Sequence, residues 1–156
     1  MTDLARQVAA LAAKVAELEA ERAILSTLYR YGHSIDYGRE ADWVDCFAEA
    51  GVFDVRPPPP AAKGLLCEGR EALATFVAGH TRAPAVWHKH LLIEPQITVA
   101  GDLKSAQVRS YFAMLDEDGP SPSIRCFGRY LDRLILCPDG VWRFLERIAE
   151  VESLRT

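Results

Sequence analysis

The sequence predicts an α+β fold in which one curled antiparallel sheet forms a cone around N-terminal helices. Two observations support this fold class. Residues 3–37 carry apolar side chains at helical spacing, and from residue 86 onward four segments have the character of long strands. Helices followed by a meander of antiparallel strands are typical of an α+β domain. A sheet curled in this way naturally encloses an apolar pocket.

Length, composition and charge limit the class of protein. With 156 residues, 49% apolar and 26% charged, the chain is expected to form one globular domain, in which residues 1–20 are a helical extension and residues 21–156 the body. The net charge of −4 argues against nucleic acid as a partner. No apolar run reaches the ~20 residues that cross a bilayer, and the N-terminus lacks the features of a signal peptide. We therefore expect no membrane partner and a cytoplasmic location.

The first helix carries two apolar stripes in succession. The first repeats at alternating steps of four and three residues, which is a heptad seam, and Arg22 interrupts it with a polar side chain. The second continues at helical spacing until Gly38, a plausible stop. The first stripe is Leu4, Val8, Leu11, Val15 and Leu18, and the second is Ile24, Leu28, Tyr31 and Ile35.

A single helix over residues 3–37 would be ~50 Å long. A domain of this size is only about 35 Å across. The first 18 or so residues must therefore protrude, break or fold back. A protruding seam predicts an oligomerisation arm, and hence a homo-oligomer such as a dimer or trimer. The alternative is a helix that folds back on its own domain.

The remaining elements follow from local patterns. Residues 42–47 suggest a short helix with Asp42 as its cap, and Pro95 indicates an edge strand or a bulge. Gly-, Pro- and Asp-rich turns, one of them at residues 119–122, separate the later strands. The other expected elements are a short strand over 52–56, a loop over 57–64, a helix over 70–78, and strands over 86–99, 105–115, 124–137 and 141–151.

Two residues far apart in the sequence, Asp36 and His90, are the main candidates for chemistry. Asp36 ends the second helical stripe and shares a helix face with Tyr29 and Gly32, so it is either carried inward or left at a solvated helix end. A carboxylate that orients an imidazole is the smallest unit that moves protons without a cofactor. His33 and His80, in contrast, are expected to be surface or capping residues.

No metal site is expected. The four cysteines, at positions 46, 67, 126 and 137, lack metal-ligand spacing and are expected to be reduced. His88 and His90 share one strand face, and with Glu94 and Gly101 they resemble the first metal motif of the cupin family. However, no histidine follows His90, so the third histidine ligand of that family is missing.

An ordered set of short motifs resembles the SnoaL-like branch of the nuclear-transport-factor-2-like superfamily. The set covers about residues 20–152, and the leading helix is similar to the start of the bile-acid 7α-dehydratases of that superfamily. It comprises residues 31–38 (YGHSIDYG), Asp42-Trp43, His90 with Pro95, Gly101-Asp102, residues 128–130 (GRY) with Asp132, and residues 139–144 (DGVWRF).

The resemblance implies a cone-shaped pocket without a cofactor. Several members, such as scytalone dehydratase, use an Asp–His pair that Asp36 and His90 match here, and Tyr31 matches the tyrosine of the bile-acid enzymes. Tyr31 and Asp36 would lie about 140° apart on an ideal helix, so the helix end would have to bend for both to reach one pocket. We expect the ligand to contact Tyr29, Val55, His88, Tyr111, Met114 and Tyr130.

The chain departs from the enzymes that it resembles at substrate-specific positions. Val55 stands where the dehydratases carry a tyrosine, and Met114 where the bile-acid enzymes carry an acid. Tyr130 and Gly128 stand where scytalone dehydratase carries an asparagine and a serine. The expected function is therefore a dehydratase-like lyase or isomerase that acts on a small hydrophobic, cyclic molecule. Two alternatives stay open, since a fold alone does not fix function. The first is a non-catalytic binding protein, and the second is an assembly subunit like the β subunits of ring-hydroxylating dioxygenases.

Overall fold

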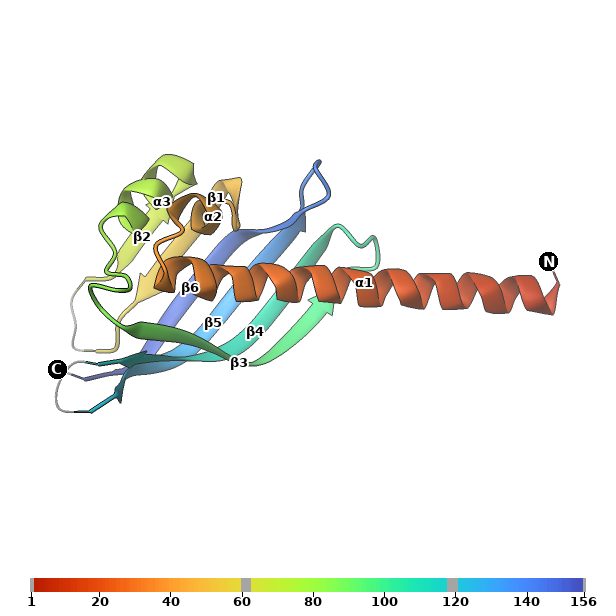
Figure 1. Cartoon of the computed structure of the whole chain (residues 1–156). Coiled ribbons are helices and arrows are strands. Elements are labelled where there is room, and N and C mark those ends of the chain that lie inside the picture. Colours follow the sequence, from red (N-terminus) through yellow and green to blue (C-terminus); the bar gives the residue numbers. More distant parts are fainter. Residues whose placement is uncertain (1, 60–62, 118–120, 156) are drawn as a thin grey trace.

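The computed structural model describes residues 2–59, 63–117 and 121–155. These residues form three helices and six strands, and all of them except one short strand follow the predicted order, with long strands last (Figure 1). The helices are α1 (Asp3–Asp36), α2 (Glu40–Val44) and α3 (Gly69–Ala78). The strands are β1 (Phe47–Arg56), β2 (Leu65–Glu68), β3 (His88–Val99), β4 (Ser105–Asp116), β5 (Ser123–Leu136) and β6 (Trp142–Leu154).

The strands form one curled sheet in the order β2-β1-β6-β5-β4-β3. The meander from β3 to β6 is antiparallel, as expected, but β1 runs parallel to β6. These two neighbouring strands come from the first and last parts of the body in the sequence, and the elements between them provide the long crossover that a parallel pair needs. α1 and α3 lie on the concave side of the sheet (Figure 1). The α+β cone is therefore confirmed, with one parallel pair.

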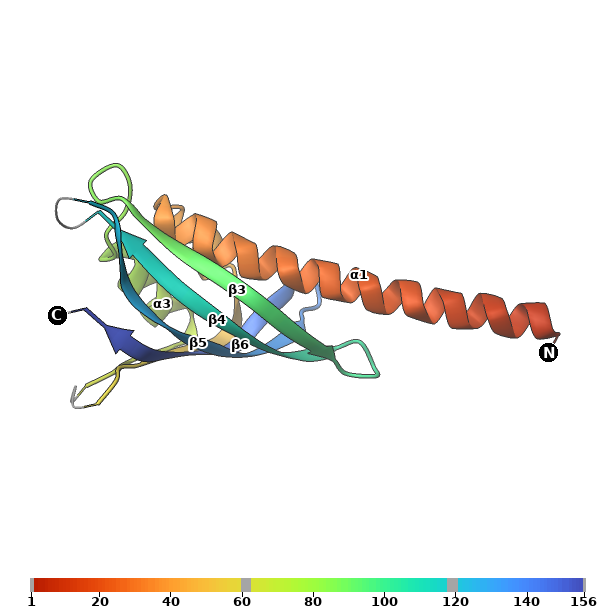
Figure 2. The same cartoon turned by 90° about the horizontal axis from the view of Figure 1, so that it is seen from below.

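Helix α1 is continuous and extends well beyond the sheet (Figure 2). It begins after Thr2, whose hydroxyl accepts a hydrogen bond from the Ala5 amide at 3.3 Å. It ends at Asp36, just before Gly38, which has a φ of +66° and so adopts the left-handed conformation that glycine tolerates. The N-terminal segment therefore protrudes and does not fold back.

The core lies between the C-terminal half of α1 and the concave face of the sheet. Ile24 and Leu28, from the second helical stripe, are buried there. Their neighbours form a cluster of aromatic rings in tilted and edge-to-face contacts, an arrangement that such rings prefer. The cluster contains Tyr31, Trp43, Phe47, Phe53 and Phe144.

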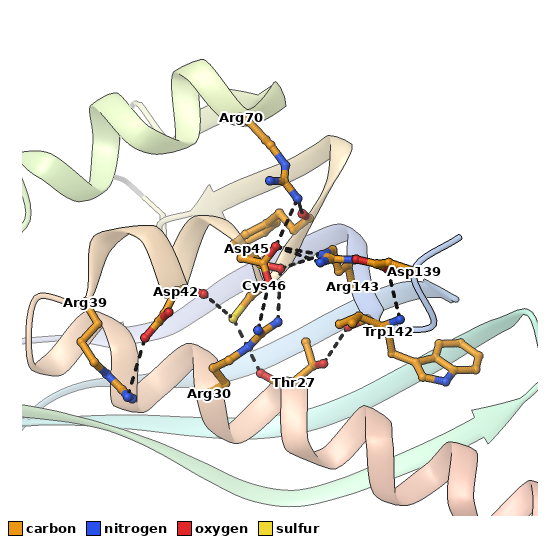
Figure 3. Close-up of polar contacts among 12 residues, drawn as sticks. Thr27, Arg30, Arg39, Asp42, Asp45, Cys46, Arg70, Asp139, Trp142 and Arg143 are labelled. Atoms are coloured by element: carbon orange, nitrogen blue, oxygen red, sulfur yellow. Dashed lines mark hydrogen bonds and ion pairs between the residues drawn. The ribbon is translucent and has the colours of Figure 1, made fainter. Parts of the chain in front are cut away.

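A polar cluster around Asp45 fixes the helices to the sheet (Figure 3). The Asp45 carboxylate accepts hydrogen bonds from Arg30 of α1 and Arg143 of β6, each at 2.9 Å. Arg70 of α3 approaches the same carboxylate at 3.5 Å. Although partial burial opposes it, the pairing with Arg143 and Arg30 lowers the pKa of Asp45. One carboxylate therefore ties together two helices and a strand.

Several local expectations have definite outcomes. Asp42 lies inside α2, and the residue at the helix N-cap is Arg39, so the predicted Asp42 cap is wrong. β3 is an edge strand, and its register against β4 shifts between Ile93 and Gln96, which confirms the feature expected at Pro95. Residues 60–62 of the predicted loop and 119–120 of the predicted turn lie outside the described residues. None of the described helices has both the length and the apolar composition of a membrane-spanning helix.

Candidate active site

Asp36 and His90 meet at the end of α1. The distance from the Asp36 carboxylate to the His90 Nδ1 atom is 2.6 Å. The His90 backbone amide lies 3.3 and 3.2 Å from the two carboxylate oxygens, so the same carboxylate orients both the ring and the strand. Only 5% of the Asp36 side chain and 13% of the His90 side chain are exposed. Of the two expectations for Asp36, the geometry therefore favours a buried carboxylate over one at a solvated helix end.

The close approach of α1 to β3 allows this contact. A Cβ atom on Gly32 would lie 3.2 Å from the His90 carbonyl oxygen, which is tighter than most such contacts. Glycine at this position lets the helix pack directly on the strand. Because Asp36 follows Gly32 by one helical turn, it lies beside the same part of β3.

His90 forms part of the wall of an apolar cavity of about 250 Å³ between the helices and the sheet. Apolar and aromatic side chains dominate its wall, and the described residues that line it include no Asp, Glu, Lys or Arg. The wall consists of Tyr31, Ile35, Phe53, Val55, Leu65, Phe76, His80, His90, Phe112, Met114, Cys126, Tyr130, Ala149 and Val151. Such a wall suits a small uncharged ligand.

The structure brings together some of the predicted site residues and separates others. Tyr31, Val55, Met114 and Tyr130 line the cavity with His90. Asp36 does not line the cavity itself; it contacts the ring of His90 from behind, so it reaches the pocket only through the histidine.

Tyr29 and Tyr111, predicted as ligand contacts, lie away from the cavity. Tyr29 is 45% exposed and lines a separate pocket of about 260 Å³ between α1 and β3, whose wall also contains Asp36 and His90. It lies about 160° from Tyr31 around the helix, so the two cannot face the same side. Tyr111 is 56% exposed, because along β4 its neighbours Ser110 and Phe112 point inward.

His88 lies on the other side of the Asp36 carboxylate. Its Nε2 atom is 3.5 Å from the nearer Asp36 oxygen and makes no hydrogen bond within the described part of the chain. It faces a separate depression that Trp87 and Asp116 also line. Burial, together with the neighbouring His90, lowers the pKa of His88 to about 4, although the Asp36 carboxylate opposes this shift. His88 is therefore neutral at physiological pH.

His80 is the site residue that the sequence analysis missed. It follows α3, and its ring centroid lies 5.3 Å from that of His88 and 5.8 Å from that of His90. Burial lowers its pKa, and its ring lines the cavity, while its backbone amide donates to the Val77 carbonyl oxygen at the end of α3. No spacing in the sequence links it to β3, because its position depends on how α3 packs over the sheet.

Two tyrosines cover a buried ion pair beside the cavity. Arg147 donates hydrogen bonds to Asp132 at 2.9 and 2.8 Å, and its guanidinium lies about 4 Å from the ring centroids of Tyr31 and Tyr130. Burial raises the pKa of Tyr31 to about 12, and it raises that of Tyr130 well above its ordinary value. Both hydroxyls therefore remain protonated, and each can donate a hydrogen bond.

Three side chains could together hold a divalent metal ion. Donor atoms of Asp36, His88 and His90 lie within 4.8 Å of one another. The cupin-like motif that the sequence resembles is a different set, since its Glu94 sits at the bulge of β3 and faces an outer groove with Tyr111. In the geometry described here, the 2.6 Å contact between Asp36 and His90 is that of a direct hydrogen bond.

The model of the SnoaL-like domain family matches residues 16–148, so the chain belongs to the SnoaL-like domain family. No curated protein matches the chain. The cone fold and this family assignment confirm the resemblance to SnoaL-like, nuclear-transport-factor-2-like proteins.

Solved structures from Novosphingobium aromaticivorans share this fold. A nuclear-transport-factor-2-like protein with a cystatin-like fold is similar with a TM-score of 0.77 and 24% identity, over 90% of this chain and 87% of the other. The β subunit of a proposed aromatic-ring-hydroxylating dioxygenase gives 0.72 and 22%, over 90% and 94%. A proposed scytalone dehydratase gives 0.70 and 21%, over 91% and 90%. At these identities the likeness concerns the fold alone.

Proposed function

We propose that the protein is a cofactor-independent lyase or isomerase that acts on a small, uncharged, hydrophobic ring compound. The observation that carries this proposal is the 2.6 Å contact between Asp36 and His90 Nδ1 at the wall of an apolar cavity. An imidazole held by a carboxylate can take a proton from carbon and pass it on without a cofactor.

The proton path follows from the orientation of His90. When Nδ1–H donates to Asp36, the lone pair of Nε2 is free to act as the base. Nε2 takes a proton from a carbon next to a carbonyl group, and the electrons of the broken C–H bond form a C=C bond. In an elimination, the C–O bond of a neighbouring hydroxyl breaks, and His90 returns its proton to that oxygen to give water. In an isomerisation, the proton returns to another carbon.

Asp36 and Tyr31 have supporting roles in this proposal. Asp36 stabilises the imidazolium that forms on His90. Tyr31 lines the cavity and keeps its proton, so it can donate a hydrogen bond to the carbonyl oxygen as negative charge develops there. Tyr111 is not included, because its exposed position on β4 is outside the cavity.

The size and polarity of the cavity support the substrate class. A volume of about 250 Å³ suits a compound of one or two rings. Burying a charged ligand group in a cavity whose wall has no counter-charge is costly, so neutral compounds are favoured. The unpaired cysteines, Cys46, Cys67, Cys126 and Cys137, support work in a reducing compartment such as the cytoplasm.

The second candidate function is that of a non-catalytic binding or assembly subunit. The exposed apolar stripe on the protruding part of α1 favours it, because such a stripe needs a partner. The likeness in fold to a dioxygenase β subunit is compatible with this role. Either candidate is consistent with a homo-oligomer, a dimer or trimer, which we also propose.

The test is a proton-abstraction assay in deuterated water. A set of hydroxylated and halogenated cyclic ketones is incubated with the protein, and NMR follows both deuterium uptake next to the carbonyl group and loss of water or halide. We expect His90→Gln and Asp36→Asn to reduce the rate by about 10²–10⁴-fold. The matched control is His33→Gln, which changes an exposed histidine of α1, the helix that carries Asp36.

The outcomes separate the two candidates. Turnover by the wild type and the His33 variant, with loss in both dyad variants, supports the enzyme. A His90→Gln protein that keeps full activity on a confirmed substrate contradicts it. Binding of the compounds without any exchange or elimination favours the binding subunit. Wild-type activity should also survive treatment with a chelator, since no step uses a metal.

A further inference from the structure

The protruding part of α1 presents an apolar stripe to solvent. Burial by the body begins at Ala20, and residues before it project beyond the sheet (Figures 1 and 2). The five apolar side chains of the heptad seam are between 51% and 69% exposed, which is unusual for a continuous stripe. They are Leu4, Val8, Leu11, Val15 and Leu18.

The identities along this stripe indicate the partner. In heptad notation, Val8 and Val15 occupy a positions, and the three leucines occupy d positions. β-Branched residues at the a positions with leucine at the d positions favour a parallel coiled coil of two helices. Arg22 is the next a residue, and one polar side chain at an a position is a device that fixes the register of a pair.

The seam faces away from the body of its own domain. On an ideal helix its mean direction lies about 150° from that of the buried stripe formed by Ile24, Leu28, Tyr31 and Ile35. A second helix can therefore approach the seam without meeting the sheet, and the two cones would lie on opposite outer sides of the pair.

Flanking charges distinguish a parallel pair from an antiparallel one. Lys14 is a g residue and Glu19 is the e residue of the next heptad, and both are exposed. In a parallel, in-register pair, the g residue of one helix faces the e residue of the next heptad on the other helix. Lys14 of each helix therefore faces Glu19 of the partner subunit, which gives two symmetric ion pairs. In an antiparallel pair centred on Leu11, Lys14 would face Gln7 of the partner subunit, and no opposite charges would meet.

We propose that residues 4–22 of α1 pair with the same segment of a second copy as a parallel two-stranded coiled coil. This pairing specifies the homo-oligomer suggested above as a dimer held by its arms. It does not depend on the chemistry proposed for His90. Each of its tests measures association and not turnover, so the two proposals can fail separately.

The direct test is disulfide cross-linking of single-cysteine additions. In the parallel pair, Val15→Cys places two thiols opposite each other at an a position. In the antiparallel pair, these residues would be about 12 Å apart along the axis, too far for a disulfide. Leu11→Cys lies at the centre of either arrangement. Ala9→Cys, on the exposed outer side of the helix, and the wild type, with its four native cysteines, are the controls.

Mild oxidation should convert the Val15→Cys and Leu11→Cys proteins to covalent dimers and leave both controls monomeric on a non-reducing gel. Cross-linking of Leu11→Cys without Val15→Cys would assign an antiparallel pair and overturn the proposal. Failure of both to cross-link above the controls would overturn any self-pairing of the arm.

Association in solution gives an independent measurement. Light scattering after gel filtration should give a dimer mass for the wild type, and a trimer mass would overturn the two-stranded arrangement. Leu11→Glu should raise the dissociation constant at least about a hundredfold, since it puts two carboxylates into the seam. Ala9→Glu is the matched control. Leu11 and Ala9 are both exposed in the described structure, so neither change should affect folding.

Discussion

Asp36 and Asp132 are both buried carboxylates on the concave side of the sheet, and their partners differ. Asp36 contacts His90 at 2.6 Å and His88 at 3.5 Å, next to a cavity. Asp132 accepts two hydrogen bonds from Arg147, and both side chains of this pair are at most 1% exposed. The guanidinium is enclosed by aromatic rings, among them that of Phe144 at 4.1 Å.

The partner decides what each carboxylate can do. An arginine stays charged in proteins, so the pair of Asp132 and Arg147 has no proton to exchange and serves structure. A histidine changes its charge close to neutral pH, so a carboxylate beside it can assist proton transfer. The pair of Asp132 and Arg147, here called the sealed pair, is also closed to a ligand, whereas His90 lines the cavity. The same residue type therefore supports the fold at one site and the proposed chemistry at the other.

The largest effect is expected from breaking the sealed pair. Asp132→Asn leaves the Arg147 charge buried without its counter-charge, and we expect a loss of about 3–5 kcal/mol in the free energy of unfolding. Asp36→Asn should cost only about 1–2 kcal/mol, because its partners are histidines that can be neutral. Urea denaturation at pH 7 measures both. Equal losses would contradict the distinction between the two carboxylates.

The next effect concerns the pH dependence of stability. The pKa of His88 is lowered to about 4 in the folded protein, where Asp36, His80 and His90 surround it, and is about 6.5 when unfolded. The unfolded state therefore binds a proton first as the pH falls. Stability from this group is complete above pH 6.5 and is lost between pH 6.5 and 4, by roughly 3 kcal/mol.

Replacing His88 isolates this contribution. Between pH 6.5 and 4, the free energy of unfolding of the His88→Gln protein should depend less on pH than that of the wild type, whatever its value at pH 7. The measurement is a series of urea titrations in buffers that contain a chelator, so that no metal shares the site. If the free energy of unfolding changed equally with pH in the two proteins, His88 would not resist protonation in the folded state.

Much of the fold could be predicted from the sequence because its elements are long and strongly patterned. α1 and the strands β3 to β6 fall within a few residues of their predicted bounds. β2 was missed because four residues carry too little pattern. The parallel pairing of β1 with β6 joins segments about a hundred residues apart, and no local signal specifies it.

The site was predictable in part, for the same reason. Asp36 and His90 belong to patterned elements, and the resemblance to known enzymes paired them. Tyr111 and Met114 could both face the cavity only if a bulge lay between them, because strand side chains alternate. The register of β4 against β5 shifts only after Met114, so Tyr111 faces outward. The place of His80 depends on tertiary packing alone.

A smaller effect is expected at Tyr31, which contacts both regions. Its ring covers the Arg147 guanidinium, while the residue also lines the cavity. Tyr31→Phe keeps the ring and removes the hydroxyl, so we expect about a tenfold fall in kcat, the value of one hydrogen bond, with little change in stability. Steady-state kinetics and thermal melting measure the two quantities. A large loss of stability with unchanged kcat would assign the hydroxyl to the structural pair.

The smallest effect is expected at an exposed carboxylate, Asp42. It lies 3.7 Å from Arg39, and each side chain of this pair is 53% exposed. Exposed pairs contribute little, so Asp42→Ala should change the free energy of unfolding by less than about 0.5 kcal/mol. If Asp42 capped α2, as the sequence suggested, the loss would be about 1 kcal/mol. Urea denaturation of the Asp42→Ala and wild-type proteins distinguishes these values, and the smaller one would complete a series in which burial and partner, and not residue type, set the contribution of each carboxylate.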